Sequence, residues 1–448
     1  MAKYKAYPEY KDSGVEWLGE IPIHWKMLRH KYVAFFTKGK NPTNLFEKPL
    51  KNTLPYLSME CLRNNTTDKY ALISNDVRVA LEGQPLIIWD GSNAGEFVKG
   101  KSGILSSTMA AATLTYPLYS QYYWYLCISI EPEMRKNAVG MGIPHVNGDE
   151  LKSISFGIPS IYEQKQVAEF LDHETAKIDN LIEKQQQLIE LLKEKRQAVI
   201  SHAVTKGLNP DVPMKDSGVE WLGEVPAHWD SVRVKQVSSF ITSGPRGWSD
   251  YITDDGDEIF LQSGDLNNEL GLNLDKAKRV SPPKNAEGVR TRLMNGDVVI
   301  CITGANTGRV AIVSKLSQKT YINQHLSLIR PETPKINSSF LGYCLTSSNG
   351  RSYFEVAQYG LKEGLNLSNI AEAPLALPPL HEQDAIVKYL KCVQNNYDYL
   401  SCLSANQVGL LQERRTALIS AAVTGKIDVR DWVAPDTQNA EELQEATA

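Results

Sequence analysis

The most regular pattern of hydrophobic and polar positions runs from Ser160 to Gly207. Apolar residues recur there at alternating steps of three and four, namely Val167, Leu171, Ile178, Leu181, Leu188, Leu192 and Val199. This spacing predicts one long helix with a narrow apolar seam, which is typical of a helix that packs against another helix. Ser160 and Glu163 have the spacing of a capping box at its start, and Gly207 can accept positive φ at its end. About 42 residues at 1.5 Å each give a rod of roughly 60 Å.

The same stretch occurs again between Pro379 and Lys426. Glu382 lies 219 residues after Glu163, and this offset holds along the whole stretch without a gap. The two predicted helices therefore form a duplicated pair. We expect the seam between them to contain Leu171, Ile178, Leu181, Leu188, Leu192, Leu390, Tyr397, Leu400, Leu411 and Leu418. The polar residues at its interruptions cost stability but fix register and direction; they are Glu174, Gln185, Lys195, Ser404, Gln407 and Arg414.

A second duplication opens each half of the chain. Residues 11–25 match residues 215–229 at 13 of 15 positions, with an offset of 204. The repeated residues include Trp17, His24 and Trp25 in the first copy. One histidine with two tryptophans is compatible with a ligand site, but it favours packing anchors that tie each domain to the helices.

Between these repeats, short apolar runs alternate with polar turns, which predicts short strands. Apolar segments over 119–130 and 338–347 predict a buried helix in each half. The fold class that we predict is α/β (α+β), with two globular domains of one fold. The expected order is an N-terminal domain over 1–157, a long helix over 158–208, a C-terminal domain over 209–376, a second long helix over 377–428, and an acidic disordered tail over 429–448.

Composition changes this picture only in part. The 448 residues are 42% hydrophobic and include no apolar run long enough for a membrane span, and the N-terminus lacks a secretory signal, so we expect a cytoplasmic protein. The six cysteines form no CxxC pair, which favours structural thiols and predicts no metal site. The net charge is −4, and residues 209–376 hold 17 Lys and Arg against 19 Asp and Glu. If the chain binds DNA, clustered loops or a partner must supply part of the phosphate neutralisation.

No catalytic constellation is visible in the sequence. Adenine methylation needs an Asn/Asp-Pro-Pro-aromatic motif, and neither Pro-Pro pair, at Pro282 and at Pro378, fits it; GxxxxGK[ST] does not occur. Gly140 and Gly142 lack the third glycine of a dinucleotide fingerprint. Glu163-Gln164-Lys165 has a nuclease-like spacing, but the duplicate has Asp384 in place of the lysine. We therefore expect a chain without enzymatic activity.

The polar loops in which the two halves differ are the candidate DNA-reading surface. Glycine allows a close approach of backbone to a duplex, and Arg, Asn and Gln can pair with base edges. Trp248 and His325 could pack on a sugar. The full candidate set is Lys38, Lys40, Asn41, Ser58, Arg63, Ser92, Asn93, His145, Asn147, Ser243, Arg246, Trp248, Gln262, Asn306, Thr307, Arg309, Gln324, His325, Lys362 and Asn366.

This layout resembles the specificity subunit of Type I restriction-modification systems. The resemblance covers the chain up to about residue 430. It depends on the alternation of variable domain and long helix, on the helix entries at residues 158–164 and 377–383, and on the paired Lys-Asp-Ser-Gly-Val-Glu-Trp-Leu-Gly-Glu openings. It implies two target-recognition domains, each reading one half of a bipartite, asymmetric DNA site, separated by an antiparallel pair of coiled-coil helices with internal pseudo-two-fold symmetry.

The resemblance also implies partners and cofactors. Double-stranded DNA and two methyltransferase subunits are the expected partners, and restriction subunits can join them. S-adenosylmethionine would be bound by the methyltransferase, ATP and Mg²⁺ by the restriction subunit, and no cofactor by this chain. Two reading heads about 10 to 13 bp apart need a separation of roughly 35 to 45 Å, which a 60 Å rod can provide.

Three alternatives remain. The first is a fused restriction-methylation enzyme, which the missing methylation motif disfavours. The second is a duplicated coiled-coil scaffold or binding protein without a DNA role, which would form no DNA-dependent complex with a methyltransferase. The third is a specificity subunit that serves methylation alone.

Overall fold

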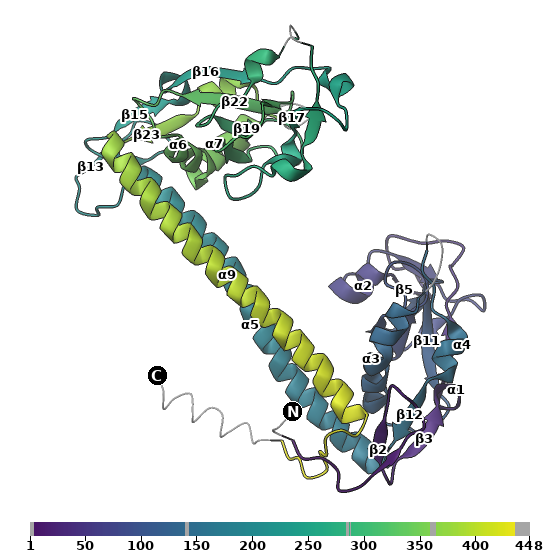
Figure 1. Cartoon of the computed structure of the whole chain (residues 1–448). Helices are drawn as coiled ribbons and strands as arrows, with labels where there is room; N and C mark the ends of the chain where they lie inside the picture. The colour runs from purple at the N-terminus through teal and green to yellow at the C-terminus, as the bar shows by residue number, and fades with distance from the viewer. Residues whose placement is uncertain (1–3, 139–142, 284–285, 287, 359–363, 435–448) are drawn as a thin grey trace. The chain divides into compact units, whose positions relative to one another are not determined.

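The computed structural model describes residues 4–138, 143–283, 286, 288–358 and 364–434 (Figure 1). The chain divides into two compact units. Unit 1 comprises residues 1–185 and 406–448, and unit 2 comprises residues 186–405. Each unit therefore contains one globular domain and one half of each long helix. Within the described residues, no helix is both long enough and apolar enough to span a membrane.

Unit 1 builds its domain from short strands and four helices within the described residues. The strands are β1 (Tyr10–Asp12), β2 (Glu20–Pro22), β3 (Lys26–Arg29), β4 (Ala34–Lys38), β5 (Thr53–Leu57), β6 (Tyr70–Leu72), β7 (Val79–Ala80), β8 (Pro85–Ile88), β9 (Phe97–Lys99), β10 (Gly103–Leu105), β11 (Met109–Leu114) and β12 (Ser155–Ile158). The helices are α1 (His30–Val33), α2 (Met59–Asn64), α3 (Ser120–Lys136) and α4 (Gly148–Ser153), followed by the long α5 (Ile161–Lys206). One four-stranded sheet has the order β4-β11-β8-β9, and a second has the order β6-β5-β10-β7.

Unit 2 repeats this topology. Its strands are β13 (Met214–Asp216), β14 (Glu224–Pro226), β15 (Asp230–Arg233), β16 (Ser238–Ser243), β17 (Glu258–Leu261), β18 (Lys278–Val280), β19 (Val298–Cys301), β20 (Val310–Ile312), β21 (Thr320–Ile322), β22 (Leu326–Pro331) and β23 (Pro374–Leu377). Its helices are α6 (Ser338–Thr346), α7 (Ser348–Ala357), α8 (Leu367–Ala371) and the long α9 (Leu380–Val423), with single turns of 3₁₀ helix between strands. The sheet order β16-β22-β19-β20 matches β4-β11-β8-β9, and the parallel pair β17-β21 matches β5-β10. The predicted duplication of a mixed fold is confirmed.

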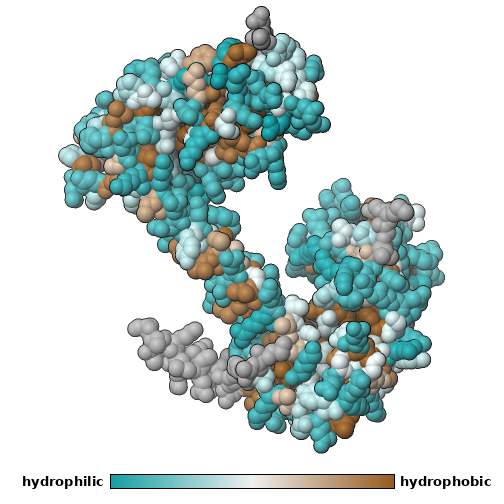
Figure 2. All heavy atoms as spheres, viewed as in Figure 1, coloured by the Kyte–Doolittle hydropathy of each residue, from teal (hydrophilic) through white to brown (hydrophobic). Residues whose placement is uncertain are grey.

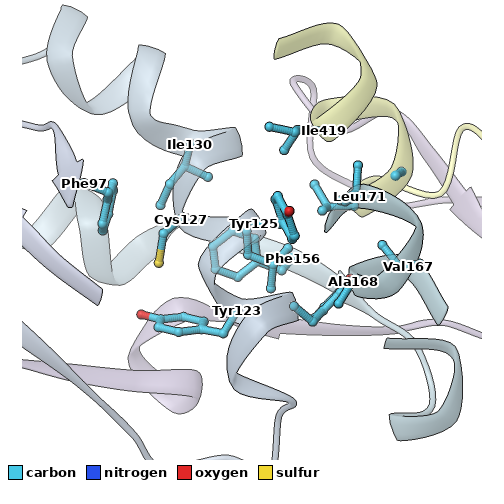
Figure 3. Close-up of a cluster of buried hydrophobic side chains, with 14 of the residues drawn as sticks. Phe97, Tyr123, Tyr125, Cys127, Ile130, Phe156, Val167, Ala168, Leu171 and Ile419 are labelled. Carbon is cyan, nitrogen blue, oxygen red and sulfur yellow. The ribbon is translucent and has the colours of Figure 1, made fainter. Parts of the chain in front are cut away.

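The core of unit 1 joins its domain to the helix pair. Tyr125 on α3, Leu171 on α5 and Ile419 on α9 belong to one cluster of buried side chains, and they face one another in Figure 3. Each of the three is at most 3% exposed. Unit 2 has the equivalent cluster, in which α6 packs on the C-terminal half of α5 and the N-terminal half of α9. Because one core spans domain and helices, each domain is held firmly on its helix ends.

A buried carboxylate reinforces this junction in unit 1. Glu163, in the first turn of α5, accepts hydrogen bonds from the Tyr7 hydroxyl at 2.6 Å and the Trp25 indole N–H at 3.0 Å. His24 Nε2 lies 3.0 Å from its other oxygen. Burial, together with the neighbouring carboxylate, raises the pKa of Tyr7 far above its ordinary value, so the phenol stays a donor. The packing-anchor interpretation of His24 and Trp25 is confirmed, whereas Trp17 is 48% exposed.

The duplicate carboxylate in unit 2 is Glu382. It contacts the Trp229 indole N–H at 3.0 Å and His228 Nε2 at 2.7 Å. Among the described residues, no tyrosine hydroxyl is hydrogen-bonded to Glu382, and its side chain is 30% exposed against 4% for Glu163. The same device thus operates in both units, but it is more deeply buried in unit 1.

These contacts change the predicted capping box. The Glu163 backbone N–H does reach the Ser160 hydroxyl, at 3.3 Å. The Glu163 side chain, however, binds the domain instead of returning to the helix start. Tertiary donors therefore replaced the local partner. At the other end, Gly207 has φ of +79° and ends α5 as expected.

In the middle of the helix pair, the buried seam positions are one residue later in the sequence than we predicted. Leu171, Ile178, Leu192, Leu390, Leu411 and Leu418 are buried and Tyr397 is partly buried, as predicted. The prediction is wrong for Leu181, Leu188 and Leu400, whose side chains are 49%, 41% and 44% exposed. Ile182, Ile189 and Ser401 are the less exposed neighbours, and they restore strict steps of three and four. Among the predicted polar positions, Ser404 is buried and Glu174 and Gln185 are partly buried, whereas Lys195, Gln407 and Arg414 are exposed.

Two ion pairs fix the register of the helices. In unit 1, Arg415 on α9 donates to Asp179 on α5 through Nε at 2.8 Å and Nη2 at 3.3 Å. In unit 2, Nη1 of Arg196 on α5 lies 3.2 Å from Asp398 on α9. Both members of the second pair lie 219 residues from those of the first. Each exposed pair contributes little stability, but sliding either helix by one turn would break both.

The segment after α9 is packed where disorder was predicted. Val429 is 2% exposed, and the Trp432 ring lies 5.5 Å from the Phe170 ring on α5. The Asp428 backbone N–H also binds the Lys5 carbonyl at 2.8 Å. The tail predicted from residue 429 therefore cannot begin before Trp432. The prediction followed the acidic composition of this segment and overlooked Val429 and Trp432, which pack against the core of unit 1.

His30 is a buried histidine in unit 1, with a side chain that is 1% exposed. Its Nδ1 donates to the Leu151 carbonyl at 3.1 Å, and its Nε2 accepts from the Tyr123 hydroxyl at 2.9 Å, which fixes the neutral tautomer. Burial lowers its pKa to about 4. The equivalent position in unit 2, 204 residues later, is Val234.

Removing the anchor carboxylates should destabilise the two units unequally. We expect Glu163→Ala to cost about 3 kcal/mol, because it leaves two buried donors unpaired, and Glu382→Ala to cost about 1 kcal/mol at its more exposed site. Urea unfolding gives the total loss, and hydrogen exchange read by mass spectrometry locates it. Equal losses in the two variants would contradict this account.

Unit 1 should lose stability in mild acid because of His30. Its folded pKa lies below the unfolded value of about 6.5, so the unfolded chain binds the proton first as pH falls. The stability is full above about pH 6.5 and is lost progressively down to about pH 4, by up to about 3 kcal/mol. His30→Val, which copies unit 2, should remove this slope in unfolding experiments at pH 7, 5.5 and 4. A variant with the wild-type slope would show that another group is responsible.

Candidate nucleic-acid interface

Equivalent turns close the central hairpin of each domain. In unit 1 the turn over 91–95 joins β8 to β9, and in unit 2 the turn over 304–308 joins β19 to β20. The backbone hydrogen bonds correspond one to one, with Gly95 N–H binding Ile88 and Gly308 N–H binding Cys301. The two turns are thus the same structural element with different side chains, as the sequence comparison predicted.

A charged cluster lies beside this turn in unit 1. Asp90 pairs with Lys38 at 2.6 Å and with His145 Nδ1 at 2.7 Å. Burial raises the pKa of Asp90, but hydrogen bonds from Lys38 and His145 outweigh it and hold the pKa below its ordinary value. Asp90 therefore stays ionised and fixes two exposed donors that the sequence placed far apart. Asn41 accepts a hydrogen bond from the Ser107 N–H at 3.2 Å.

Unit 2 has a cluster without a carboxylate at the equivalent place. The Thr303 hydroxyl hydrogen bonds to His325 Nδ1, and Gln324 Nε2 lies 3.2 Å from His325 Nε2. Thr303 forms an isolated bridge with Gly364, just as Asp90 does with His145. Gln324 and His325 are both exposed. The bridge positions Asp90 and Thr303 are thus equivalent; Lys38 and His145 contact the first, and His325 with Gln324 beside it contacts the second.

Several predicted residues instead hold the frame together. Ser58, Asn147 and Asn366 are helix caps, whose side chains accept from backbone N–H groups. Asn306, Thr307 and Arg309 donate to the carbonyls of Ser263, Gly304 and Leu266. Arg63 makes a close ion pair with Glu96 at 2.7 Å, and Gln262 begins a 3₁₀ turn.

The remaining candidates divide into accessible and inaccessible residues. Lys40, Ser92 and Arg246 are exposed, and Asn93 and Ser243 are partly so. Lys362 lies outside the described residues. Trp248 contradicts our expectation, because it is 2% exposed and packs against Phe260 and Tyr321. Its ring fills the small core under β17 and β18, so it cannot pack on a sugar.

Two loop glycines serve the protein's own backbone. A Cβ at Gly39 would lie 2.1 Å from the Ser106 carbonyl oxygen, and one at Gly244 would lie 2.1 Å from that of Ile322. These glycines are required where the chain crosses itself. Their presence is therefore explained without a duplex nearby.

Asp90 and Thr303 are the central residues that sequence reasoning missed. Both follow the buried strand of the central hairpin, at Ile88 and Cys301, and precede the repeated glycine turn. That shared position was a usable signal. Their partners come from other loops, which sequence spacing does not reveal.

Comparisons with known proteins agree with this architecture. The family model for the Type I restriction modification DNA specificity domain matches residues 22–191 and 226–401. The Type I restriction enzyme MjaVIII specificity subunit of Methanocaldococcus jannaschii is 26% identical over 419 residues, which cover 92% of this chain and 95% of that one. The EcoBI specificity subunit of Escherichia coli is 22% identical, and the match covers 91% of this chain and 88% of that one.

A solved structure of a type I R-M system shares the fold. It has a TM-score of 0.67 and 16% identity, and the match covers 91% of this chain and 99% of the other. Both matched regions of the family model fall on the two copies of the duplication described above. The chain therefore belongs to the family of Type I restriction-modification DNA specificity subunits.

Proposed function

We propose that this chain selects DNA sites for a methyltransferase and does no chemistry itself. In this proposal, each domain reads one half of a bipartite, asymmetric sequence in double-stranded DNA. The observation that carries it is the pair of equivalent polar clusters, built on one frame with different side chains. A scaffold would have no reason to keep the frame while changing only the exposed groups.

The chemistry of the clusters suits direct readout. Lys38 and His145 in unit 1 offer donors, which favour guanine O6 and N7 in the major groove. Gln324 in unit 2 can form a bidentate pair with adenine N6 and N7, and His325 is exposed beside it. Because the two sets differ, the two half-sites are expected to differ, so the complete site is asymmetric.

The long helices would set the unread gap between the half-sites. α5 has 46 residues and α9 has 44, and at 1.5 Å per residue these helices are each roughly 65 to 70 Å long. That length accommodates half-sites whose centres lie about 35 to 45 Å apart on DNA. The pairs Arg415–Asp179 and Arg196–Asp398 prevent sliding, which a fixed gap requires.

The same helices offer a surface for partner subunits. Leu181 and Leu410 in unit 1 are exposed, as are Leu188, Leu400 and Leu403 in unit 2, and brown patches mark the helices in Figure 2. We propose that methyltransferase subunits dock on these apolar positions, one for each unit. S-adenosylmethionine would then belong to the methyltransferase, and ATP and Mg²⁺ to a restriction subunit where one joins.

The first test is methylation sequencing of DNA from cells that express this chain with its methyltransferase. A split, asymmetric adenine motif should appear only when the chain is present. Absence of methylation despite formation of the complex would favour a scaffold without DNA reading.

Substitutions in one cluster should change one half-site only. We expect Lys38→Ala to relax or alter the half read by unit 1, and His325→Ala the half read by unit 2, each with about 1–3 kcal/mol less discrimination. The motifs from methylation sequencing measure this directly, and each variant is the control for the other. A change in both halves from one substitution would refute the assignment of clusters to half-sites.

Lengthening the helices should widen the gap without changing the bases read. Seven residues inserted after Gln185 in α5 and after Ser404 in α9 keep the seam in register and add about 10.5 Å. The gap should grow by about 3 bp while both half-sites persist. An altered half-site with an unchanged gap would contradict the proposal that the helices set the gap.

A further inference from the structure

A cationic pocket lies between α5 and the globular domain of unit 2. Its volume is about 340 Å³, and Lys193, Arg196, Arg309 and Arg351 are among its lining residues, with no Asp or Glu. Asn267 and Gln197 add side-chain amides. Two of the lining cations have carboxylate partners, since Lys193 pairs with Glu190 and Arg196 pairs with Asp398. Glu355 lines the adjoining pocket.

The guanidinium groups of Arg196, Arg309 and Arg351 all have unused donors. Arg196 Nε is one of three buried side-chain atoms in the described part of the chain that lack a hydrogen-bond partner. Arg351 has no side-chain hydrogen bond or ion pair with any described residue, and Arg309 uses one nitrogen on the Leu266 carbonyl. A buried unpaired donor on a charged group is costly, and an anion is the partner that satisfies it best.

The other copy of the duplication shows that this arrangement is particular to unit 2. Arg415, the counterpart of Arg196, uses Nε and Nη2 to bind both oxygens of Asp179. Glu96 stands where unit 2 has Arg309, at the same place after the hairpin turn, and it pairs with Arg63 and Arg135. Unit 1 thus pairs these charges internally, whereas in unit 2 Arg196, Arg309 and Arg351 line one cavity.

We infer that this pocket binds a phosphate group, held by Arg196, Arg309 and Arg351. A tetrahedral oxyanion offers acceptors to several forked guanidinium groups at once. Two sources share this chemistry: a free phosphate compound, and a backbone phosphate of DNA beside the turn over 304–308. The second source rests on the proposed function and would supply the neutralisation that a domain with 17 basic and 19 acidic residues needs.

The direct test is calorimetric titration of the purified full chain with inorganic phosphate. We expect one saturable site on the wild type and at least about tenfold weaker binding for Arg351→Gln, an exposed position without structural contacts. Arg309→Glu, which copies Glu96 of unit 1, should abolish it. Arg415→Met and Arg196→Met each remove one inter-helix ion pair, but only Arg196→Met should lose phosphate.

A second arm separates the two sources. DNA affinity is measured against salt concentration for the wild type and Arg351→Gln, on cognate and non-cognate duplexes. If the source is DNA, the variant binds every duplex more weakly, its salt slope falls by about 0.9, and phosphate competes with DNA. If the source is a free compound, phosphate binding depends on Arg351 while DNA affinity and slope do not change.

One pattern overturns the inference. In this pattern, phosphate either does not bind the wild type or binds the wild type and Arg309→Glu equally. In addition, Arg351→Gln leaves the salt slope of DNA binding unchanged. Circular dichroism of each variant verifies that it is folded. The loss of the phosphate site would leave the bipartite motif of the proposed function intact, so the two ideas fail separately.

Discussion

The structure depends on a carboxylate placed at the first turn of each long helix. Glu163 and Glu382 bind the indole N–H of the tryptophan that ends the repeated opening segment. A buried carboxylate is tolerated only when donors surround it, so any movement of the domain on the helix that breaks these hydrogen bonds without admitting water is costly. This constraint converts two otherwise separate elements, a helix and a small sheet domain, into one body in each unit.

With the domains held on the helices, the helix pair needs only to keep its register. Hydrophobic packing alone is weakly specific here, because the middle of the seam contains Gln185, Ser401 and Ser404 and few large apolar side chains. The two ion pairs related by the duplication supply the missing specificity, since charge partners must meet at a defined separation. The polar middle also leaves nearby leucines exposed, which is the surface that we assign to partner subunits.

A rigid frame allows its loops to diverge. The hairpin turns after β8 and β19 keep the same backbone hydrogen bonds, yet Asp90 is replaced by Thr303 and Glu96 by Arg309. The exchange of Asp90 for Thr303 alters the polar groups that we propose face a base edge. The exchange of Glu96 for Arg309 replaces a carboxylate that pairs within the domain by a cation that we propose binds an anion. Both changes cost little stability because they occur on exposed or partly exposed turns.

The sequence by itself determined the duplication, the two long helices, the order of domains and the equivalence of the hairpin turns, because each is encoded in residue spacing along one segment. Only the tertiary structure decided which residues meet. Seam positions such as Ile182 were displaced by one residue, Trp248 turned inward to fill a small core, and Val429 and Trp432 were packed although the tail is acidic. Asp90 gained its partners from 52 and 55 residues away, namely Lys38 at the end of β4 and His145 before α4. Local periodicity reports the backbone pattern, whereas burial and pairing between distant loops depend on contacts that no local pattern encodes.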